Sequence, residues 1–210
     1  IILAAGEGSR MKSKKPKVLH KIFNQPMIHH VIAAAKQCGC EKICVVVGHQ
    51  AEQVKEAILQ NDITFALQKQ QLGTGHAVMQ AMDFLEEDKN LLILYGDTPL
   101  ITAESLNELI SFHESQNNDV SIVSAIVEDP TGYGHIIRDG QGNFVKNVEH
   151  KDASQAEKAI KEINTGIYYF KGSALKKALA QLTNDNAQGE YYLPDTLSIL
   201  LQSGYRVNAL

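Results

Sequence analysis

The sequence predicts an α/β fold, with a Rossmann-like, mostly parallel sheet flanked by helices and a small β-rich lobe after it. In the first half, short apolar segments alternate with segments of helical periodicity. This pattern is typical of βαβ units and of a sheet buried on both faces. In the second half, turn-forming residues are dense and strands follow one another more closely. We therefore expect one domain over residues 1–210, divided into halves 1–118 and 119–210.

The elements of the first half are expected where periodicity and stop signals agree. Ile1–Ala5 is an apolar run of strand length, and a polar loop with two glycines follows it as far as Lys17. The first helix is expected to begin at Pro26, since proline is favoured at the first helical position, and to stop at Gly39. Strands and helices then alternate over Lys42–Val47, Ala51–Gln60, Ile63–Leu67, Thr74–Leu85, Leu91–Tyr95 and Ala103–Gln116.

A long strand and a hairpin are expected to open the second half. The strand is Val120–Val127, which precedes the turn-rich segment Asp129–Gly134. The turn at residues 139–142 separates two short runs that favour a hairpin. The remaining expected elements are the strands His135–Arg138, Asn143–Glu149 and Ile163–Phe170 and the helices Ser154–Glu162, Ala174–Leu182 and Pro194–Gln202.

Composition and charge narrow the classes of function. Hydrophobic residues make up 44% of the 210 residues and the formal net charge is −4, so the chain can bury a core but lacks the basic excess typical of nucleic-acid binding. No apolar run approaches the roughly 18–20 residues that cross a bilayer. The cysteines Cys38, Cys40 and Cys44 are odd in number and lack CxxC spacing. We expect reduced thiols, a cytoplasmic location and neither a membrane nor a nucleic-acid partner.

The loop after the first strand is the strongest functional signal. It reads LAAGEGSRM and is followed by Pro16-Lys17. Its two glycines leave backbone N–H groups able to turn toward a bound anion, and Arg10 and Lys17 place two cations beside them. A dinucleotide fingerprint would need a third glycine three residues after Gly8, and a Walker A loop would need a Gly-Lys pair; the sequence has neither. The loop therefore predicts a polyphosphate site at the carboxyl end of the first strand.

Asp97 is the candidate metal ligand. It follows Leu91–Tyr95 and Gly96, at the sheet edge that the glycine loop is expected to share. Mg²⁺ prefers hard oxygen ligands, typically one or two carboxylates together with substrate phosphates. The Thr98-Pro99 pair leaves open the alternative that Asp97 is only a turn or helix-cap residue.

Gln68 and the turn Gly73-Thr74-Gly75 are the candidate base site. An amide side chain can both donate and accept hydrogen bonds, as a pyrimidine edge requires. The glycine-rich turn exposes backbone groups at the start of a helix. On these residues alone, a capped helix entrance is as good an interpretation as a base site.

The histidines indicate no metal site. His29 and His30 are adjacent, so on a helix they project about 100° apart and make a poor chelate. His20 and His76 have no partner that the sequence identifies, and no His–Asp pairing suggests a general base.

Six segments in a fixed order add a family resemblance. They are LAAGEGSRM with PK, LQKQQLGTGHAV, LYGDTPLI, DPTGYGHI, VEHKDA and EINTGIYYF. Together they closely resemble the pyrophosphorylase domain of the bacterial bifunctional N-acetylglucosamine-1-phosphate uridyltransferase/glucosamine-1-phosphate acetyltransferases. The first loop and YGD alone would indicate only the sugar nucleotidyltransferase superfamily, whereas the other segments narrow the resemblance. It covers nearly the whole chain.

The resemblance implies a nucleotide-binding first half with three catalytic residues. Arg10 would assist the departing pyrophosphate, Lys17 would neutralise the phosphates and Asp97 would bind Mg²⁺. The residues that would contact the nucleotide are Leu3, Ala4, Ala5, Gly6, Lys17, Gln68, Gly73 and Thr74. Among these, Gln68, Gly73 and Thr74 would read uracil.

The same resemblance implies a sugar-binding second half. Gly134, Glu149 and Asn164 would hold the N-acetylglucosamine moiety, while Tyr95 and Gly96 would line the pocket. The family completes its metal site with an asparagine that would lie downstream of residue 210. Its C-terminal acetyltransferase domain, a left-handed β-helix, is expected to be absent from this chain. The full-length protein would be a homotrimer largely through that domain, so we expect a monomer for residues 1–210.

The implied activity is uridylyl transfer from UTP to N-acetylglucosamine 1-phosphate. The products would be UDP-N-acetylglucosamine, a precursor of peptidoglycan and lipopolysaccharide, and pyrophosphate, and the full-length protein would also acetylate glucosamine 1-phosphate. No general base is needed, because a phosphate monoester is largely ionised at neutral pH. Two alternatives stay open. One is another sugar-1-phosphate nucleotidyltransferase, such as a glucose-1-phosphate thymidylyl- or uridylyltransferase, and the other is a non-catalytic nucleotide-binding scaffold module.

Overall fold

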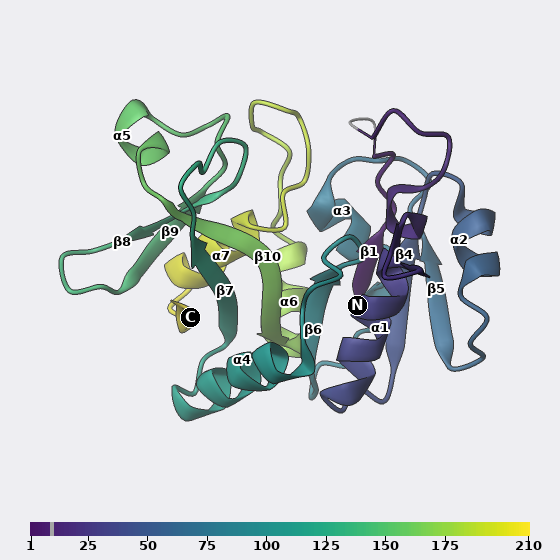
Figure 1. The fold of residues 1–210 in the computed structure, drawn as a ribbon. Helices are drawn as coiled ribbons and strands as arrows, with labels where there is room; N and C mark the ends of the chain where they lie inside the picture. The colour runs from purple at the N-terminus through teal and green to yellow at the C-terminus, as the bar shows by residue number, and fades with distance from the viewer. Residues whose placement is uncertain (9–10) are drawn as a thin grey trace. The chain divides into compact units, whose positions relative to one another are not determined.

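The computed structural model describes residues 1–8 and 11–210 and shows two compact units (Figure 1). Unit 1 comprises Ile1–Phe84 and Ile93–Glu108. Unit 2 comprises Leu85–Leu92 and Leu109–Leu210. The sequence predicted a single division after residue 118, whereas in the structure the short segment Leu85–Leu92 groups with the later residues.

Close packing at Gly172 explains why that short segment belongs to unit 2. The Gly172 N–H donates to Lys89 O at 2.8 Å, and the Ser173 N–H donates to Glu87 O at 3.0 Å. A Cβ added at Gly172 would lie 2.8 Å from Lys89 O, so only glycine permits this approach of two backbones. Such a contact leaves no signature in the local pattern of residues 85–92.

Unit 1 is built on a parallel sheet with the strand order β6-β1-β4-β5 (Figure 1). Val45, Val46 and Val47 of β4 are completely buried, as expected for a strand covered on both faces. Leu3 is aligned with Val46 on one side and with Tyr95 on the other, so neighbouring strands end at one edge. The strands are β1 (Ile2–Ala4), β4 (Ile43–Val47), β5 (Ile63–Leu67) and β6 (Asn90–Tyr95).

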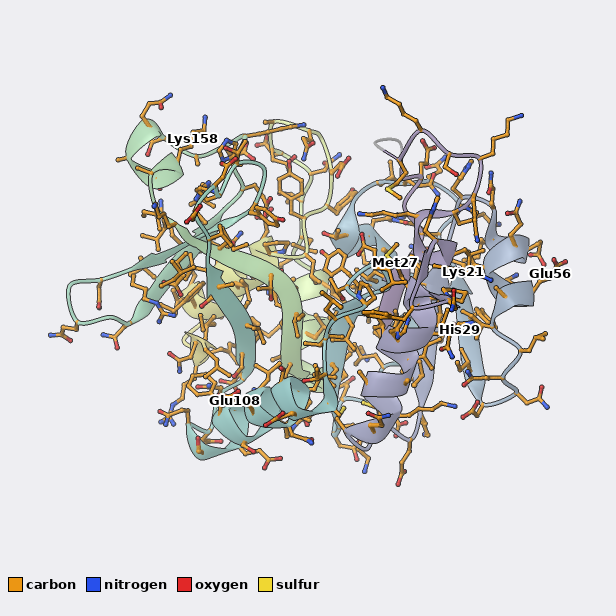
Figure 2. The ribbon with its side chains drawn as sticks, in the orientation of Figure 1. Lys21, Met27, His29, Glu56, Glu108 and Lys158 are labelled. Atoms are coloured by element: carbon orange, nitrogen blue, oxygen red, sulfur yellow. The ribbon has the colours of Figure 1, made fainter. Side chains whose placement is uncertain are left out.

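Helices flank this sheet (Figure 1). They are α1 (Met27–Gln37), α2 (Ala51–Ala57) and α3 (Thr74–Met79), with 3-10 turns at η2 (Lys17–Leu19) and η3 (Met82–Phe84). A further helix, α4 (Ala103–Ser115), begins in unit 1 and ends in unit 2. Figure 2 shows Met27 and His29 on α1 and Glu56 on α2. A two-stranded hairpin, β2 (Lys21–Ile22) with β3 (Gln25–Pro26), precedes α1, so Pro26 pairs in a strand and α1 begins one residue later than expected.

The helix expected over Thr74–Leu85 is interrupted. The main-chain N–H of Gln80 bonds Ala77 O three residues back, while its side-chain Nε2 donates to His76 O at 3.1 Å. That carbonyl would accept the Gln80 main-chain N–H in a continued α-helix, so the side chain competes with the backbone. The expected helix Ala51–Gln60 is also shorter, since α2 ends at Ala57.

Unit 2 is a largely antiparallel sheet in the order β11-β7-β10, with β8 paired to both β10 and β9. Only β11 runs parallel to its neighbour β7. The strands are β7 (Val120–Ile126), β8 (His135–Arg138), β9 (Phe144–Val148), β10 (Glu162–Lys171) and β11 (Val207–Ala209). The helices are α5 (Gln155–Lys158), α6 (Gly172–Leu179) and α7 (Asp195–Gln202). The predicted α/β class with a mostly parallel sheet and a β-rich part is confirmed.

In unit 2 one expected helix was wrong and one strand was not predicted. The helix expected over Ser154–Glu162 is the single turn α5, which a capping box between Ser154 and Glu157 closes at its start. Glu162 instead begins β10, where it is aligned with Ile126. Strand β11 was not expected, because three residues are too few to show a period. Among the described residues, no helix is long and apolar enough to cross a membrane.

Candidate active site

The strongest candidate site lies at the carboxyl edge of the unit 1 sheet. Strand β1 ends at Ala4 and β6 at Tyr95, and both strands lead into loops at this edge. Main-chain hydrogen bonds fix the two loops: Gly96 N donates to Leu3 O at 2.9 Å, and His49 N donates to Ala5 O at 3.2 Å. The backbone that follows β1 is therefore held between the ends of its two neighbours, where open α/β sheets bind ligands.

The two glycines of the first loop have different environments. A Cβ added at Gly6 would meet no atom of residues 1–8 and 11–210 within 4 Å, so these residues leave open space over Gly6. Gly8 has a φ of +63°, and an added Cβ would lie 2.8 Å from Lys17 Cβ. Gly8 is therefore required by the packing of Lys17, whereas packing against the described residues places no such requirement on Gly6.

Lys17 and Asp97 are brought together, as the sequence predicted. Lys17 Nζ forms an ion pair with Asp97 Oδ2, and the two side chains are 34% and 24% exposed. Lys17 begins η2, and Asp97 follows β6 in a turn in which Thr98 Oγ1 donates to Tyr95 O at 2.7 Å. The third predicted catalytic residue, Arg10, lies outside the described residues.

The fit of a metal ion depends on Asp97. Among residues 1–8 and 11–210, no group of three or more His, Cys, Asp or Glu side chains is placed to hold a metal ion. One oxygen of Asp97 is engaged by Lys17, which leaves its other oxygen as a possible ligand. This donor set fits an ion that takes most of its ligands from substrate phosphates and water, as Mg²⁺ does, and not one enclosed by protein.

Gln68 lies at the end of β5, at the same edge of the sheet. It is 4% exposed, and its Nε2 group lies 3.0 Å from Gly73 O and 3.0 Å from His76 Nδ1. Its main-chain N–H donates to Val47 O at 2.8 Å, which ties it to the end of β4. Gly73, with a φ of 104°, is the N-cap of α3, and Thr74 is the first helical residue. The predicted base-reading residues Gln68, Gly73 and Thr74 therefore meet at one helix start.

The predicted sugar residues divide between the units. Tyr95 and Gly96 belong to unit 1, while Gly134, Glu149 and Asn164 belong to unit 2. In unit 2 the three are neighbours, because a Cβ added at Gly134 would lie 2.7 Å from Glu149 Oε1 and Asn164 N donates to Gly134 O at 2.8 Å.

A chain of amides, which the sequence did not reveal, joins these three residues. Asn147 Nδ2 donates to Glu149 Oε1 at 3.2 Å, and Asn164 Nδ2 donates both to Asn147 Oδ1 at 3.2 Å and to Tyr168 Oη at 2.8 Å. Asn164 Oδ1 accepts from Gly166 N at 2.9 Å. On β9 the buried residues Phe144 and Asn147 are separated by two exposed residues, so the period of two does not mark Asn147 as inward-facing, and no local pattern marks it as a partner of Asn164.

Carboxyl groups beside this chain are difficult to ionise. Burial raises the pKa of Glu149, and the charge of Asp152 adds to the increase, while the hydrogen bond from Asn147 opposes it. Burial, followed by the charges of Glu149 and Asp152, raises the pKa of Asp195 to about 6. Burial is the largest cause of both pKa increases, whereas the Asp97 carboxylate is paired with Lys17.

His29, His30 and His76 have structural partners, whereas the buried Nε2 of His20 has no hydrogen-bond partner among the described residues. His29 Nε2 lies 2.9 Å from Ala57 O, and His30 Nε2 lies 2.8 Å from Ile22 O, so the adjacent rings bond different carbonyls. His76, for which the sequence identified no partner, contacts Gln68 through Nδ1 and Gln80 through Nε2, at 3.0 Å and 3.2 Å. The sequence could not reveal these contacts of His76, because they depend on how the helix start packs against β5.

Comparisons with known proteins agree with this geometry. The chain matches the nucleotidyl transferase family over residues 1–210. It is 53% identical over its whole length to the bifunctional protein GlmU of Caldanaerobacter subterraneus subsp. tengcongensis, and 54% identical to that of Thermoanaerobacter pseudethanolicus. It spans about half the length of these curated relatives, 46% in both cases.

Solved structures with low sequence identity share the fold. A UDP-glucose pyrophosphorylase complexed with UDP-glucose has a TM-score of 0.79 at 18% identity, and covers 99% of this chain and 88% of its own. A Bacillus anthracis protein described as a glucose-1-phosphate thymidylyltransferase, in complex with sucrose, has a TM-score of 0.82 at 21% identity, covering 100% of this chain and 85% of its own. With the family match over all 210 residues and relatives above 50% identity, the chain belongs to the nucleotidyl transferase family.

Proposed function

We propose that this chain transfers a uridylyl group from UTP to N-acetylglucosamine 1-phosphate, releasing pyrophosphate and forming UDP-N-acetylglucosamine. One observation carries the proposal: Lys17 and Asp97 form an ion pair at the edge where the glycine loop leaves β1. A cation, a carboxylate and unshielded backbone at one sheet edge suit a triphosphate with its metal ion. The GlmU relatives favour this particular sugar and nucleotide.

The proposed reaction requires that the two substrates are positioned for attack and that the charge of their phosphates is neutralised. An oxygen of the sugar phosphate attacks the α-phosphorus of UTP; the new P–O bond forms as the bond to the β-phosphate breaks, and pyrophosphate leaves with the electron pair. Mutual repulsion of the two phosphate groups opposes this approach. A cation about 4 Å from a phosphate charge offsets roughly 4 kcal/mol at an effective dielectric near 20. Lys17 supplies such a cation, and Arg10 would supply a second.

Family membership indicates a divalent metal ion, and we propose Mg²⁺. Asp97 would hold it through the carboxylate oxygen that Lys17 leaves open. When bound, Mg²⁺ would neutralise charge on the triphosphate. We further propose that Gly134, Glu149 and Asn164 bind the sugar, since amides and a carboxylate are suited to hydroxyl groups.

Location and assembly belong to the same proposal. The cysteines Cys38, Cys40 and Cys44 are free thiols, which supports a cytoplasmic location. Acetylation of glucosamine 1-phosphate and a homotrimer are proposals for the longer protein, because the chain spans only 46% of the GlmU relatives.

A substrate panel tests the proposed reaction. Pyrophosphate release is measured with UTP, CTP, dTTP and ATP, each combined with N-acetylglucosamine 1-phosphate or glucose 1-phosphate, with Mg²⁺ and with chelator. We expect the highest kcat/KM for UTP with N-acetylglucosamine 1-phosphate, and no release with chelator. A preference for glucose 1-phosphate would instead indicate a glucose-1-phosphate nucleotidyltransferase. Nucleotide binding without pyrophosphate release from any pair would indicate a scaffold module.

A further inference from the structure

The orientation of the Gln68 side-chain amide is fixed by a carbonyl. Gly73 O can only accept hydrogen bonds, so the Gln68 atom 3.0 Å from it must be the NH₂ group. The same Nε2 lies 3.0 Å from His76 Nδ1, which must then accept the second N–H. Both amide protons are directed into the protein.

The oxygen of the same amide is the group presented to a ligand. Gln68 Oε1 accepts no hydrogen bond from the described residues and is not sealed from solvent, although the residue as a whole is 4% exposed. In these surroundings, the Gln68 amide can accept a hydrogen bond from a ligand but cannot donate one to it. A flipped amide would bring an oxygen against Gly73 O, and two acceptors at 3.0 Å repel.

His76 completes this arrangement only in one protonation state. An accepting Nδ1 requires a neutral imidazole whose proton is on Nε2. On the other side of the ring, Gln80 Nε2 lies 3.2 Å from His76 Nε2. A neutral ring cannot accept at both nitrogens, so only one contact is a hydrogen bond. Gln80 Nε2 already donates to His76 O at 3.1 Å, so the Gln80 amide does not depend on the ring for a partner. The Gln68 contact is the shorter of the two, at 3.0 Å, and His76 Nδ1 is the acceptor that remains for the second N–H of Gln68.

We propose that His76 is a positioning residue that holds Gln68 with its oxygen toward the base and thereby selects uracil over cytosine. The inference rests on the proposed function. Uracil carries an N–H at ring position 3, which can donate to Gln68 Oε1. Cytosine has a bare nitrogen there, which would face the oxygen with no proton between them. Thymine carries the same N–H as uracil, so His76 does not distinguish these two bases.

Nucleotide binding by two variants tests the inference. The dissociation constants of UTP, CTP and dTTP are measured by calorimetry for the unmodified chain, His76→Leu and His76→Asn. His76→Leu removes the acceptor, and we expect the preference for UTP over CTP to fall about tenfold, the effect of one hydrogen bond. His76→Asn returns an oxygen close to the position of Nδ1 and should restore the preference. The ratio of UTP to dTTP should stay constant throughout.

A matched variant controls for general effects of the substitution. His29→Leu removes another half-buried histidine of unit 1 that bonds a main-chain carbonyl, and it should leave the preference for UTP over CTP unchanged. A preference unchanged in His76→Leu, or lost equally in His76→Asn, would overturn the inference.

A second measurement needs no nucleotide. The ¹⁵N NMR shifts of the His76 ring in the free protein report which nitrogen carries the proton, and we expect Nε2. A proton on Nδ1 would overturn the inference whatever the binding data show. A chain that prefers UTP to CTP but releases no pyrophosphate contradicts the proposed function alone, whereas one that binds neither nucleotide contradicts both.

Discussion

The two units of this protein carry polar groups of different chemistry at their candidate ligand residues. At the sheet edge of unit 1, a cation, a carboxylate and glycine backbone lie together, and Lys17 is the ionic partner of Asp97. In unit 2, Gly134 lies against a chain of amides that ends at Glu149, a carboxyl group whose pKa burial raises. Charges suit phosphates and amides suit hydroxyls, so the contrast indicates which part of a nucleotide-sugar each unit would bind.

The largest effect is expected from breaking the charged pair of unit 1. Lys17→Ala and Asp97→Ala should each lower kcat by about 100-fold or more, on the order of 3 kcal/mol, because each removes a charge that acts on the transferred phosphate. Pyrophosphate release under saturating substrates measures the change. Asp62→Ala is the control, since it breaks an ion pair with Lys36, at 2.5 Å, outside the candidate site. Near-normal rates in both site variants would remove the assignment of this edge.

Substitutions of the two loop glycines test two different effects, the approach of a ligand at Gly6 and protein packing at Gly8. The methyl group of Gly6→Ala meets no atom of the described residues within 4 Å, so it should leave the free energy of unfolding within about 0.5 kcal/mol and yet raise the KM for UTP about 20-fold. Gly8→Ala should lower stability by about 1 kcal/mol, because it forces a positive φ and displaces Lys17. Urea unfolding and steady-state kinetics on both variants make the comparison. An unchanged KM for UTP in Gly6→Ala would place the nucleotide elsewhere.

The amide chain of unit 2 can be displaced by a single methyl group. In Gly134→Ala the new Cβ would lie 2.7 Å from both Asn147 Oδ1 and Glu149 Oε1, so these side chains must shift. We expect the KM for the sugar phosphate to rise about tenfold while the KM for UTP changes little. Gly140→Ala, in the nearby hairpin turn and in open space, is the control and should be neutral. Equal rises of both KM values would contradict the division of roles between the units.

The smallest effect is a pH dependence of stability centred on Asp195. Its pKa is raised from 3.8 to about 6, so between these values the native state binds more protons than the unfolded state and stability falls as pH rises. Above about pH 7 the whole penalty is present; allowing for partial exposure, it is about 1 kcal/mol. Asp195→Asn should therefore be more stable than the unmodified chain at pH 7.5, with the difference vanishing near pH 4. Urea titrations at both pH values measure it, and a pH-independent difference would contradict this cause.

Local patterns predicted the strands whose apolar runs are long enough to be recognised. The strand Ile63–Leu67 has the predicted bounds, and the strands over 43–47 and 90–95 differ by one residue. Errors arose where a side chain or a distant strand decides the backbone. The helix after Thr74 is interrupted by the Gln80 side chain, and β11 exists because it pairs with β7, about 87 residues earlier in the chain.

The sequence by itself determined the α/β class, the glycine loop and the residue types that the chemistry needs. It could do so because the apolar pattern of a strand, the conformational freedom of glycine and the chemistry of a carboxylate can each be recognised in a few neighbouring residues. The tertiary structure alone decided contacts that no pattern predicted, such as those of Asn147 with Asn164 and of Gln68 with His76. These contacts join residues from different elements, and their geometry depends on how strand ends align and how loops pack, which no local pattern records.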